Sequence, residues 1–270
     1  MQTISHIQTY PRRPSKAVEY KYSMNATELS MWKRGAEISL RNNPGWRKYD
    51  GVISDIAATY NRHFQGDGVC SPGLFVVPFV DPKLLRAIVY TETGPGVKQE
   101  AWEKRPMQIG NAGDLGINDV LATDNFIGEN AKLILPDAYK YLTFENIRNQ
   151  AKENIIAGTA YLLMRACTFA TVTLIDDGNP SEISVTKDLS NLERIAKAVE
   201  TTVEVLLKLN PGINPNSLRP GQKLLYIKAK KKRVIYSMER LDFNFTASVY
   251  NVSGDSAYKD KLEFFYNFPD

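Results

Sequence analysis

The sequence is poor in the side chains from which many active sites are built. Its 270 residues include two histidines, His6 and His63, and two cysteines, Cys70 and Cys167. So few histidines argue against a histidine-built metal site and against a Ser-His-Asp hydrolase. The cysteines match no metal-binding spacing, and two free thiols are commoner than a disulfide here, although that pairing stays open. A phosphate-binding glycine loop of the Walker type is lacking too. We therefore expect no metal and no cofactor, and chemistry that rests on carboxylates.

Long apolar runs are also missing. No stretch approaches the roughly 20 residues that a membrane-spanning helix needs. Residues 1–14 lack the apolar segment of a Sec signal peptide. We therefore expect a protein without a membrane span that is made in the cytoplasm and that reaches any external substrate by another route.

The charge balance has only a small excess of one sign. The chain carries 34 basic and 30 acidic residues, a net charge of +4. This is too little to indicate a nucleic-acid-binding protein, but it suits an anionic polymer. Much of the excess lies in residues 228–233, which are either a solvated linker or strand end or a surface that faces such a polymer.

One predicted helix places a carboxylate on an apolar face. Asp81-Pro82 predicts its start, because Asp accepts hydrogen bonds from free amides and Pro suits the first helical position. Gly94-Pro95 predicts its end. Glu92 follows Ile88 and Val89 by four and three residues, so it continues their apolar stripe in the last turn.

Two effects would help Glu92 to keep its proton. Burial removes its solvation, and the negative end of the helix dipole disfavours its charge. A general acid that works near neutral pH needs this environment. The alternative is a buried glutamate paired with a neighbouring Arg or Lys, and spacing alone does not separate the two.

The rest of the chain predicts helices separated by loops, and then a small module. We expect an irregular lead over residues 1–24, helices over 25–42, 49–63 and 144–169, and a β-like run over 171–175. The module consists of a strand at 183–185, two short helices opened by Ser190-x-x-Glu193 and Thr201-x-x-Glu204, and a strand at 223–227.

This module resembles the LysM domain family. The match lies in residues 201–211 (TTVEVLLKLNP) and 218–224 (LRPGQKL), whereas 187–189 (KDL) replaces the usual Gly-Asp-Thr. The resemblance implies binding of N-acetylglucosamine polymers in a shallow groove between two loops. The residues that it places along this groove are Asp188, Leu189, Asn210, Pro211, Gly212 and Ile213. A scaffold that no longer binds sugar is the alternative.

Three segments before the module resemble the catalytic half of lytic transglycosylases and goose-type lysozymes. They are residues 87–94 (AIVYTETG), 107–109 (MQI) and 154–162 (NIIAGTAYL), in the family's order. The resemblance implies that Glu92 is the catalytic acid and that Met107 and Gln108 contact substrate. Arg105-Pro106 stands where the family usually has Gly-Leu, so this loop can differ in shape.

The family's next segment appears only after the LysM-like module, at residues 246–251 (TASVYN). We therefore predict an α+β protein in which a mainly α-helical lysozyme-like domain, residues 1–172 and 234–270, contains an inserted βααβ LysM module with flanking strands, residues 173–233. Tyr250 and Asn251 are predicted to bind substrate, with a core tyrosine as the alternative for Tyr250.

The resemblance implies cleavage of the β-1,4 bond between N-acetylmuramic acid and N-acetylglucosamine in peptidoglycan. A transglycosylase needs only Glu92 and leaves a 1,6-anhydro sugar, whereas a hydrolase usually needs a second carboxylate. Candidates for a second one are Glu103, Asp114 and Asp119, unless they are surface charges. The two outcomes stay open.

The expected partners are peptidoglycan glycan strands, with a secretion apparatus or an immunity protein as further candidates and no nucleic acid. A bacteriolytic enzyme without a Sec signal would reach the periplasm or cell wall by non-Sec delivery, such as type VI-like secretion or prophage lysis. The rival hypothesis is a non-catalytic cell-wall-binding, secretion or phage apparatus component with a decayed lysozyme fold.

Overall fold

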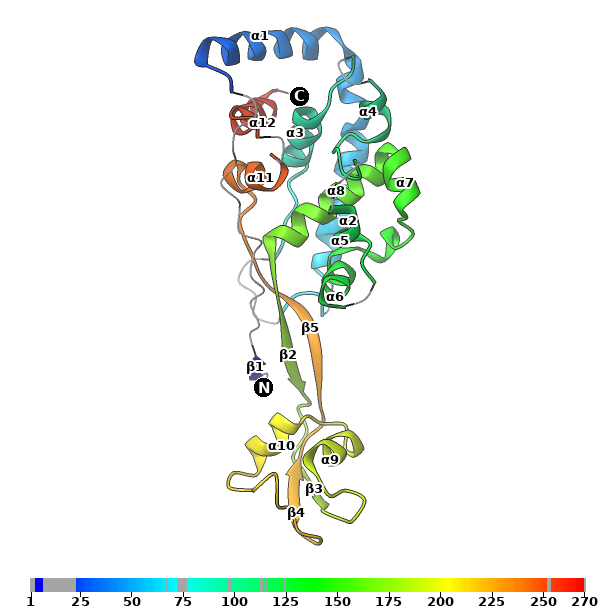
Figure 1. Cartoon of the computed structure of the whole chain (residues 1–270), viewed down its shortest axis with the longest axis vertical. Coiled ribbons are helices and arrows are strands. Elements are labelled where there is room, and N and C mark those ends of the chain that lie inside the picture. The colour runs from blue at the N-terminus through cyan, green and yellow to red at the C-terminus, as the bar shows by residue number, and fades with distance from the viewer. Residues whose placement is uncertain are drawn as a thin grey trace. The chain divides into compact units, whose positions relative to one another are not determined.

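A computed structural model gives the fold, which is α+β with small antiparallel sheets (Figure 1). It describes residues 3–6, 23–66, 68–71, 77–96, 99–111, 114, 116–123, 125–251 and 254–269. The backbone divides into two compact units: Met1–Thr9 with Phe169–Val234, and Tyr10–Thr168 with Ile235–Asp270. The predicted boundaries at 172–173 and 233–234 lie close to these positions. Thr3–His6, which we expected in the larger domain, belongs to the smaller unit.

The larger unit is helical. Its elements before the smaller unit are α1 (Ala26–Asn42), η1 (Pro44–Tyr49), α2 (Asp50–Phe64), α3 (Pro82–Glu92), α4 (Gln99–Lys104), α5 (Gly116–Val120), α6 (Asn125–Ile134), η2 (Asp137–Tyr139), α7 (Phe144–Asn149) and α8 (Ala151–Ala166). Its elements after the smaller unit are α11 (Phe243–Tyr250) and α12 (Tyr258–Asn267). In the described part of the chain, no helix has both the length and the apolar character that crossing a membrane requires.

The single helix expected over 144–169 is wrong. Gln150 is extended, with φ −131° and ψ 124°, and separates α7 from α8. The Asn154 side chain donates to the Ile147 carbonyl at 2.9 Å. In a continuous helix that carbonyl would accept from the amide of Ala151, so a buried side chain takes the place of a helical hydrogen bond.

Helix α3 begins and ends as the sequence predicts. Asp81 accepts a hydrogen bond from the amide of Lys83, and Pro82 occupies the first turn. Thr93 is extended and closes the helix. The stripe that includes Ile88 and Val89 is buried, so the last turn carries Glu92 at the edge of the core.

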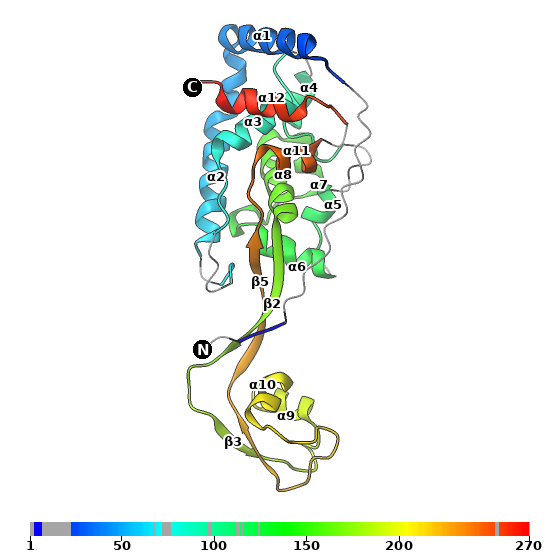
Figure 2. The ribbon, with the colours of Figure 1, turned by 90° about the vertical axis from the view of Figure 1, so that its left-hand side faces the viewer.

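Helices α3 and α12 lie side by side in both ribbon views (Figure 2). Phe265 of α12 is almost fully buried, with ring centroids 5.5 Å from Trp46 and 5.6 Å from Tyr90. A Cβ on Gly94 would lie 2.5 Å from the Trp46 ring, so only glycine fits where the chain leaves α3. This aromatic cluster connects the C-terminal segment to the helix that bears Glu92.

The smaller unit contains the short strands. Its elements are β1 (Thr3–His6), β2 (Cys167–Ile175), β3 (Ser181–Ser184), α9 (Leu192–Ala198), α10 (Val203–Leu209), β4 (Lys223–Tyr226) and β5 (Ala229–Met238). The chain passes between the two units within β2 and β5. One sheet has the order β1-β2-β5, and β3 pairs antiparallel with β4. Strand β1 corrects the irregular lead that we expected, because its pairing partner Thr173 lies far along the chain.

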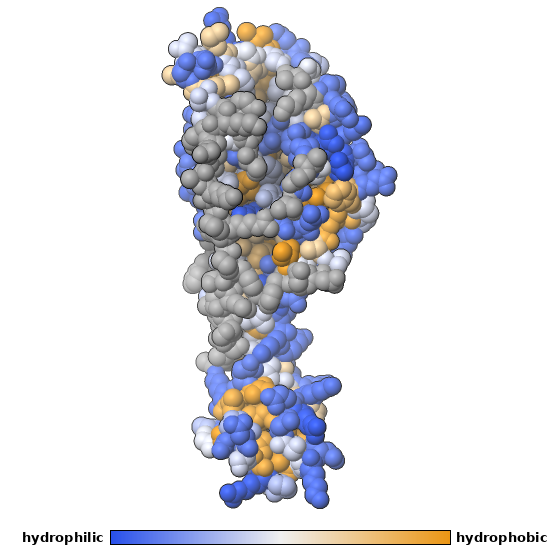
Figure 3. Space-filling view, viewed as in Figure 1, coloured by the Kyte–Doolittle hydropathy of each residue, from blue (hydrophilic) through white to orange (hydrophobic). Residues whose placement is uncertain are grey.

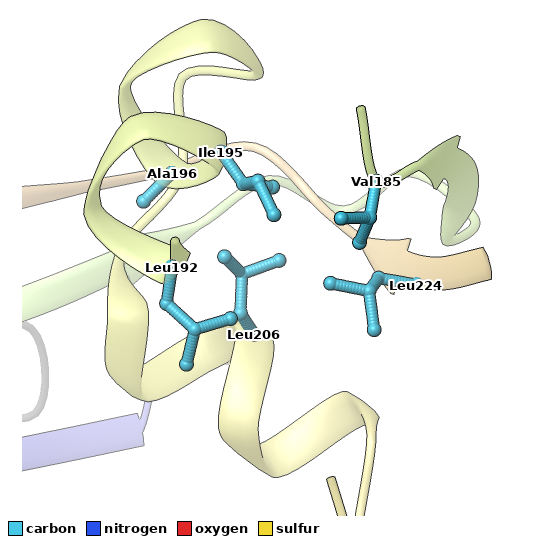
Figure 4. Packing of buried hydrophobic residues seen from close by; sticks show 6 residues of the cluster. All are labelled: Val185, Leu192, Ile195, Ala196, Leu206 and Leu224. Carbon is cyan, nitrogen blue, oxygen red and sulfur yellow. The ribbon is translucent and has the colours of Figure 1, made fainter. Parts of the chain in front are cut away.

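The module between β3 and β4 has a small core of its own. Side chains from both helices and both flanking segments point toward one another (Figure 4). They are Val185, Leu192, Ile195, Ala196, Leu206 and Leu224. The two helix caps lie one residue later than predicted: Asn191 and Thr202 accept from the amides three residues ahead, and Ser190 and Thr201 are not the caps. These positions direct Leu192, Ile195 and Leu206 into the core.

The two cysteines are free thiols, with Cys167 buried and Cys70 half-buried. Burial raises the pKa of the Cys167 thiol well above its usual value, and the nearby Cys70 adds to the shift. Thiols in this state are poor nucleophiles, so neither cysteine is a candidate for the chemistry.

The packing of α12 predicts the effect of a core truncation. Phe265→Ala should lower the free energy of unfolding by about 3–5 kcal/mol, because it leaves a cavity among aromatic rings. The matched control is Phe79→Ala, at a side chain that is 63% exposed, and it should change stability by less than about 0.5 kcal/mol. Denaturant unfolding measures both. Equal effects would show that α12 is not part of the core.

Candidate functional site

The end of α3 is tied to the loop that follows α4. The Thr93 hydroxyl donates to the carbonyl of Pro106 at 2.9 Å, and Thr93 is buried. The residue after Glu92 therefore holds the backbone just before Met107 and Gln108. Two of the three segments singled out from the sequence meet here.

The third segment holds the same loop from the other side. The amide of Met107 donates to Asn154 Oδ1 at 3.0 Å, and Asn154 Nδ2 donates to the carbonyl of Ile109 at 2.8 Å. A Cβ on Gly158 would lie 2.8 Å from Met107 Sδ, so the absence of a side chain there lets Met107 pack against α8. Met107 is buried and packs in the core of the loop, and its contact with substrate stays a prediction.

Two tyrosines from the C-terminal segment complete the surroundings of Glu92. The Tyr258 hydroxyl donates to Glu92 Oε1 at 2.6 Å, and the Tyr250 hydroxyl donates to the carbonyl of Gly158 at 2.5 Å. Burial, and after it the negative charge of Glu92, raise the pKa of both tyrosines well above the usual value. The half-buried Glu92 and Tyr250 and the buried Tyr258 thus form one cluster at the end of α3.

The side-chain amide of Gln108 is used within its own loop. Gln108 Nε2 donates to the carbonyl of Arg105 at 2.9 Å, and its Oε1 accepts from Asn111 Nδ2 at 3.2 Å. Its φ of 57° lies in the left-handed region, which is uncommon for a residue with a side chain. Strained backbone of this kind often occurs at functional sites, and here the surrounding hydrogen bonds hold it.

Asn251 is likewise a turn residue. Its Nδ2 donates to the carbonyl of Asp255, and its Oδ1 accepts from the Asp255 amide, each at 2.7 Å. Both polar ends of the side chain are therefore engaged in the turn between α11 and α12. The binding of substrate by Asn251 stays a prediction, and these two hydrogen bonds would have to be exchanged for it.

The three candidates for a second carboxylate differ in their surroundings. Asp114 accepts from the amides of Gly110 and Gly116, at 2.7 and 2.8 Å, and its charge also contributes to the raised pKa of Tyr250. Glu103 lies on the surface of α4 and pairs with Lys48. Asp119 is half-buried on α5. Of the three, Asp114 is the one whose charge reaches the Glu92 cluster.

Sequence reasoning missed Tyr258 as a site residue. No local pattern marks it, because its contact with Glu92 joins residues 166 positions apart. Asn154 belonged to a recognised segment, but its role in joining that segment to the Met107 loop depends on the packing of α8 against the loop. The available signal was an asparagine placed directly before the apolar run of Ile155, Ile156 and Ala157.

The two loops predicted to line a sugar groove are anchored on one core. Leu189 from the first loop and Ile213 from the second are half-buried against the same cluster, whereas Asp188, Pro211 and Gly212 are exposed. Asn210 Nδ2 donates to the carbonyls of Leu206 and Leu225, and its Oδ1 accepts from the amide of Leu225. Asn210 is therefore a clamp between α10 and β4 that supports its loop.

The basic run at 228–233 lies in and beside β5. Lys228 pairs with Glu200, and Lys231 pairs with Glu204, both at 2.6 Å. The Arg233 guanidinium lies over the Phe169 ring at 5.9 Å. The contacts of Lys228, Lys231 and Arg233 agree with a solvated strand end. The two ion pairs are exposed to solvent, so they add little stability.

Apolar groups also reach the surface of the module. Figure 3 shows them gathered on the face that carries α10 and β4. These elements contribute two exposed leucines, Leu207 and Leu225.

Comparison with known families matches residues 190–225 to the LysM domain. The chain therefore carries a LysM domain, a module that is associated with binding to peptidoglycan. Comparisons with curated proteins and with solved structures gave no match. The LysM match covers the two helices and most of β4, so the pattern read at 201–224 is confirmed.

The clamp predicts a local loss of stability. Asn210→Ala should destabilise the LysM domain by about 1–2 kcal/mol, because the amide and the carbonyl of Leu225 both lose the side chain that they bind. Native-state hydrogen exchange of the α10 amides in the full chain measures the change. Asn214→Ala, which removes one hydrogen bond in an exposed turn, is the control with a smaller expected effect. Unchanged protection of α10 in the first variant would contradict the assigned role.

Proposed function

We propose that the protein cleaves peptidoglycan glycan strands as a lysozyme-like lytic transglycosylase, with Glu92 as its acid and the LysM domain as its wall-binding module. One observation carries this proposal. The three segments that resemble such enzymes meet at the loop of Pro106 and Met107 through Thr93, Asn154 and Gly158. Because Thr93 directly follows Glu92, this meeting point lies next to the proposed acid in the chain.

The proposed chemistry needs one carboxylate. Glu92 gives its proton to the glycosidic oxygen between N-acetylmuramic acid and N-acetylglucosamine, and the bond from that oxygen to the anomeric carbon breaks. Glu92 then takes the proton of the muramic C6 hydroxyl, whose oxygen bonds to the anomeric carbon and closes a 1,6-anhydro ring. The engagement of Asp114 by two backbone amides supports this scheme over a hydrolase with two free carboxylates.

Tyr250 and Gln108 shape the proposed site in different ways. Tyr250 links α11 to α8, with its ring in an edge contact to Tyr161 and its hydroxyl on Gly158. An aromatic ring there suits a sugar face. Gln108, whose amide is held by Arg105 and Asn111, would act on substrate only after exchanging those partners.

The LysM domain contributes binding. Attachment to the glycan raises the concentration of scissile bonds around the enzyme without altering the chemical step. In this proposal the protein acts at the cell wall.

A non-catalytic wall-binding component is the second candidate. The family match favours it, since the match covers the LysM domain alone. The local hydrogen bonds of Gln108 and Asn251 favour it as well, because they leave fewer polar groups for substrate. The two candidates differ in whether purified protein releases muropeptides.

Glu92→Gln tests the catalytic assignment. The variant should lose nearly all release of soluble fragments from sacculi while its thermal stability stays about the same, because the amide oxygen still accepts from Tyr258. Glu103→Gln, at an exposed carboxylate on α4, is the matched control and should keep full activity. Mass spectra of the products identify anhydro-muropeptides or reducing ends. If Glu92→Gln stays active, Glu92 is not the catalytic acid. If the wild type is inactive, the non-catalytic wall-binding component is the better candidate.

Removal of the LysM domain tests its contribution. The amide of Asp176 donates to the carbonyl of Lys228 at 2.9 Å, so the ends of residues 177–227 lie together and a short Gly-Ser linker can replace that segment. The shortened protein should fold and should bind sacculi at least tenfold more weakly in a pull-down. Full-length Glu92→Gln, which keeps the domain, should bind as the wild type does. If the shortened protein binds sacculi as well as the wild type does, the LysM domain is not the wall-binding module.

A further inference from the structure

We propose that Arg105 binds a carboxylate of the peptide stem that N-acetylmuramic acid carries, and that it makes the protein prefer glycan strands with charged stems. This inference deepens the proposed function and rests on it. The residue is particular to this chain, because Arg105 and Pro106 stand where the enzymes that the chain resembles usually have Gly-Leu.

Arg105 directly follows α4, and its backbone is held on both sides. Its amide donates to the carbonyl of Ala101 at 2.7 Å, which continues the hydrogen bonds of the helix. Its carbonyl accepts from the amide of Gln108 and from Gln108 Nε2, each at 2.9 Å. The next residue, Pro106, is the one whose carbonyl binds Thr93. The backbone that bears the Arg105 side chain is therefore fixed next to the end of α3 and to Gln108.

The guanidinium of Arg105 has a buried donor without a protein partner. Its Nε is buried, and the described residues offer it no hydrogen-bond acceptor. Burial of a charged donor without a partner costs free energy, so most such groups in folded proteins bind an acceptor. The residue as a whole is only half-buried, so part of it remains in contact with solvent. A ligand that enters from solvent can therefore supply the acceptor.

The carboxylates nearest to Arg105 in the sequence are already engaged by lysines. Glu100 pairs with Lys104 at 3.2 Å, and Glu103 pairs with Lys48. Within the part of the chain that the structure describes, no carboxylate forms an ion pair with Arg105. Its positive charge is therefore available to an anion from outside the protein.

A carboxylate of the peptide stem fits this donor in chemistry and in place. A guanidinium binds a carboxylate through two parallel hydrogen bonds, which are charge-assisted and stronger than neutral ones. The hydroxyl and acetamido groups of a glycan strand are uncharged, so its carboxylates lie on the muramic acid substituent and on the attached peptide. The bond that we propose for cleavage starts at N-acetylmuramic acid, so a stem is attached to the sugar next to Glu92.

The test uses soluble glycan strands whose stem amines are acetylated, before and after conversion of the stem carboxylates to methylamides. The wild type should cleave the charged strands with a kcat/KM about tenfold higher, which is the size of one lost hydrogen bond to a charged group. In Arg105→Gln this ratio should fall to about one, because kcat/KM on the charged strands falls. Lys104→Gln removes a neighbouring cation that is paired with Glu100, so this matched control should keep the wild-type ratio. An unchanged ratio in Arg105→Gln would overturn the inference.

Binding is measured apart from cleavage, by NMR of the Glu92→Gln protein with nitrogen-15 in its arginine side chains. The Arg105 Nε signal is assigned by its absence when Arg105→Lys is added. The acetylated disaccharide tetrapeptide of peptidoglycan should shift this signal, and its methylamide form should not. No shift, or equal shifts with both compounds, would refute the role of Arg105 even if Arg105→Gln failed to fold. The expected shift together with an inactive wild type would instead refute the proposed cleavage alone.

Discussion

The candidate site depends on the hydrogen bonds of one buried amide. Asn154 is fully buried on α8, and its side chain meets the amide of Met107 and the carbonyls of Ile109 and Ile147. Three backbone groups that would otherwise lie unsatisfied in the core find their partner there, and each lost partner costs about 1–3 kcal/mol. The break between α7 and α8 and the path of the Met107 loop both follow from this arrangement.

The position of Glu92 depends in turn on packing around α3. Thr93 joins the helix end to the Met107 loop, and Gly94 makes room for Trp46. On the other side, α12 contributes Phe265 to the aromatic cluster and Tyr258 to the carboxylate. The C-terminal segment thus belongs both to the core and to the candidate site, because the same helix fills the core and carries the donor to Glu92.

The LysM domain is organised on a smaller scale. Its core of six side chains comes from residues 185–224, and the Asn210 clamp joins α10 to β4 within the same segment. A domain whose contacts are this close in sequence can move between proteins as a unit. Its presence connects the protein to peptidoglycan, whereas the role that we propose for the larger unit depends on Glu92.

The sequence by itself determined the features whose causes lie within a few residues. The Asp81-Pro82 start and Thr93 end of α3, the buried stripe that leads to Glu92, and the LysM domain all follow from local caps, spacing and turns. Only the tertiary structure decided the break at Gln150, the pairing of β1 with β2, the engagement of Gln108 and Asn251 in their own loops, and the contact of Tyr258 with Glu92. Each of these depends on which polar groups meet when distant segments pack, and a buried polar group takes the partner that folding brings to it.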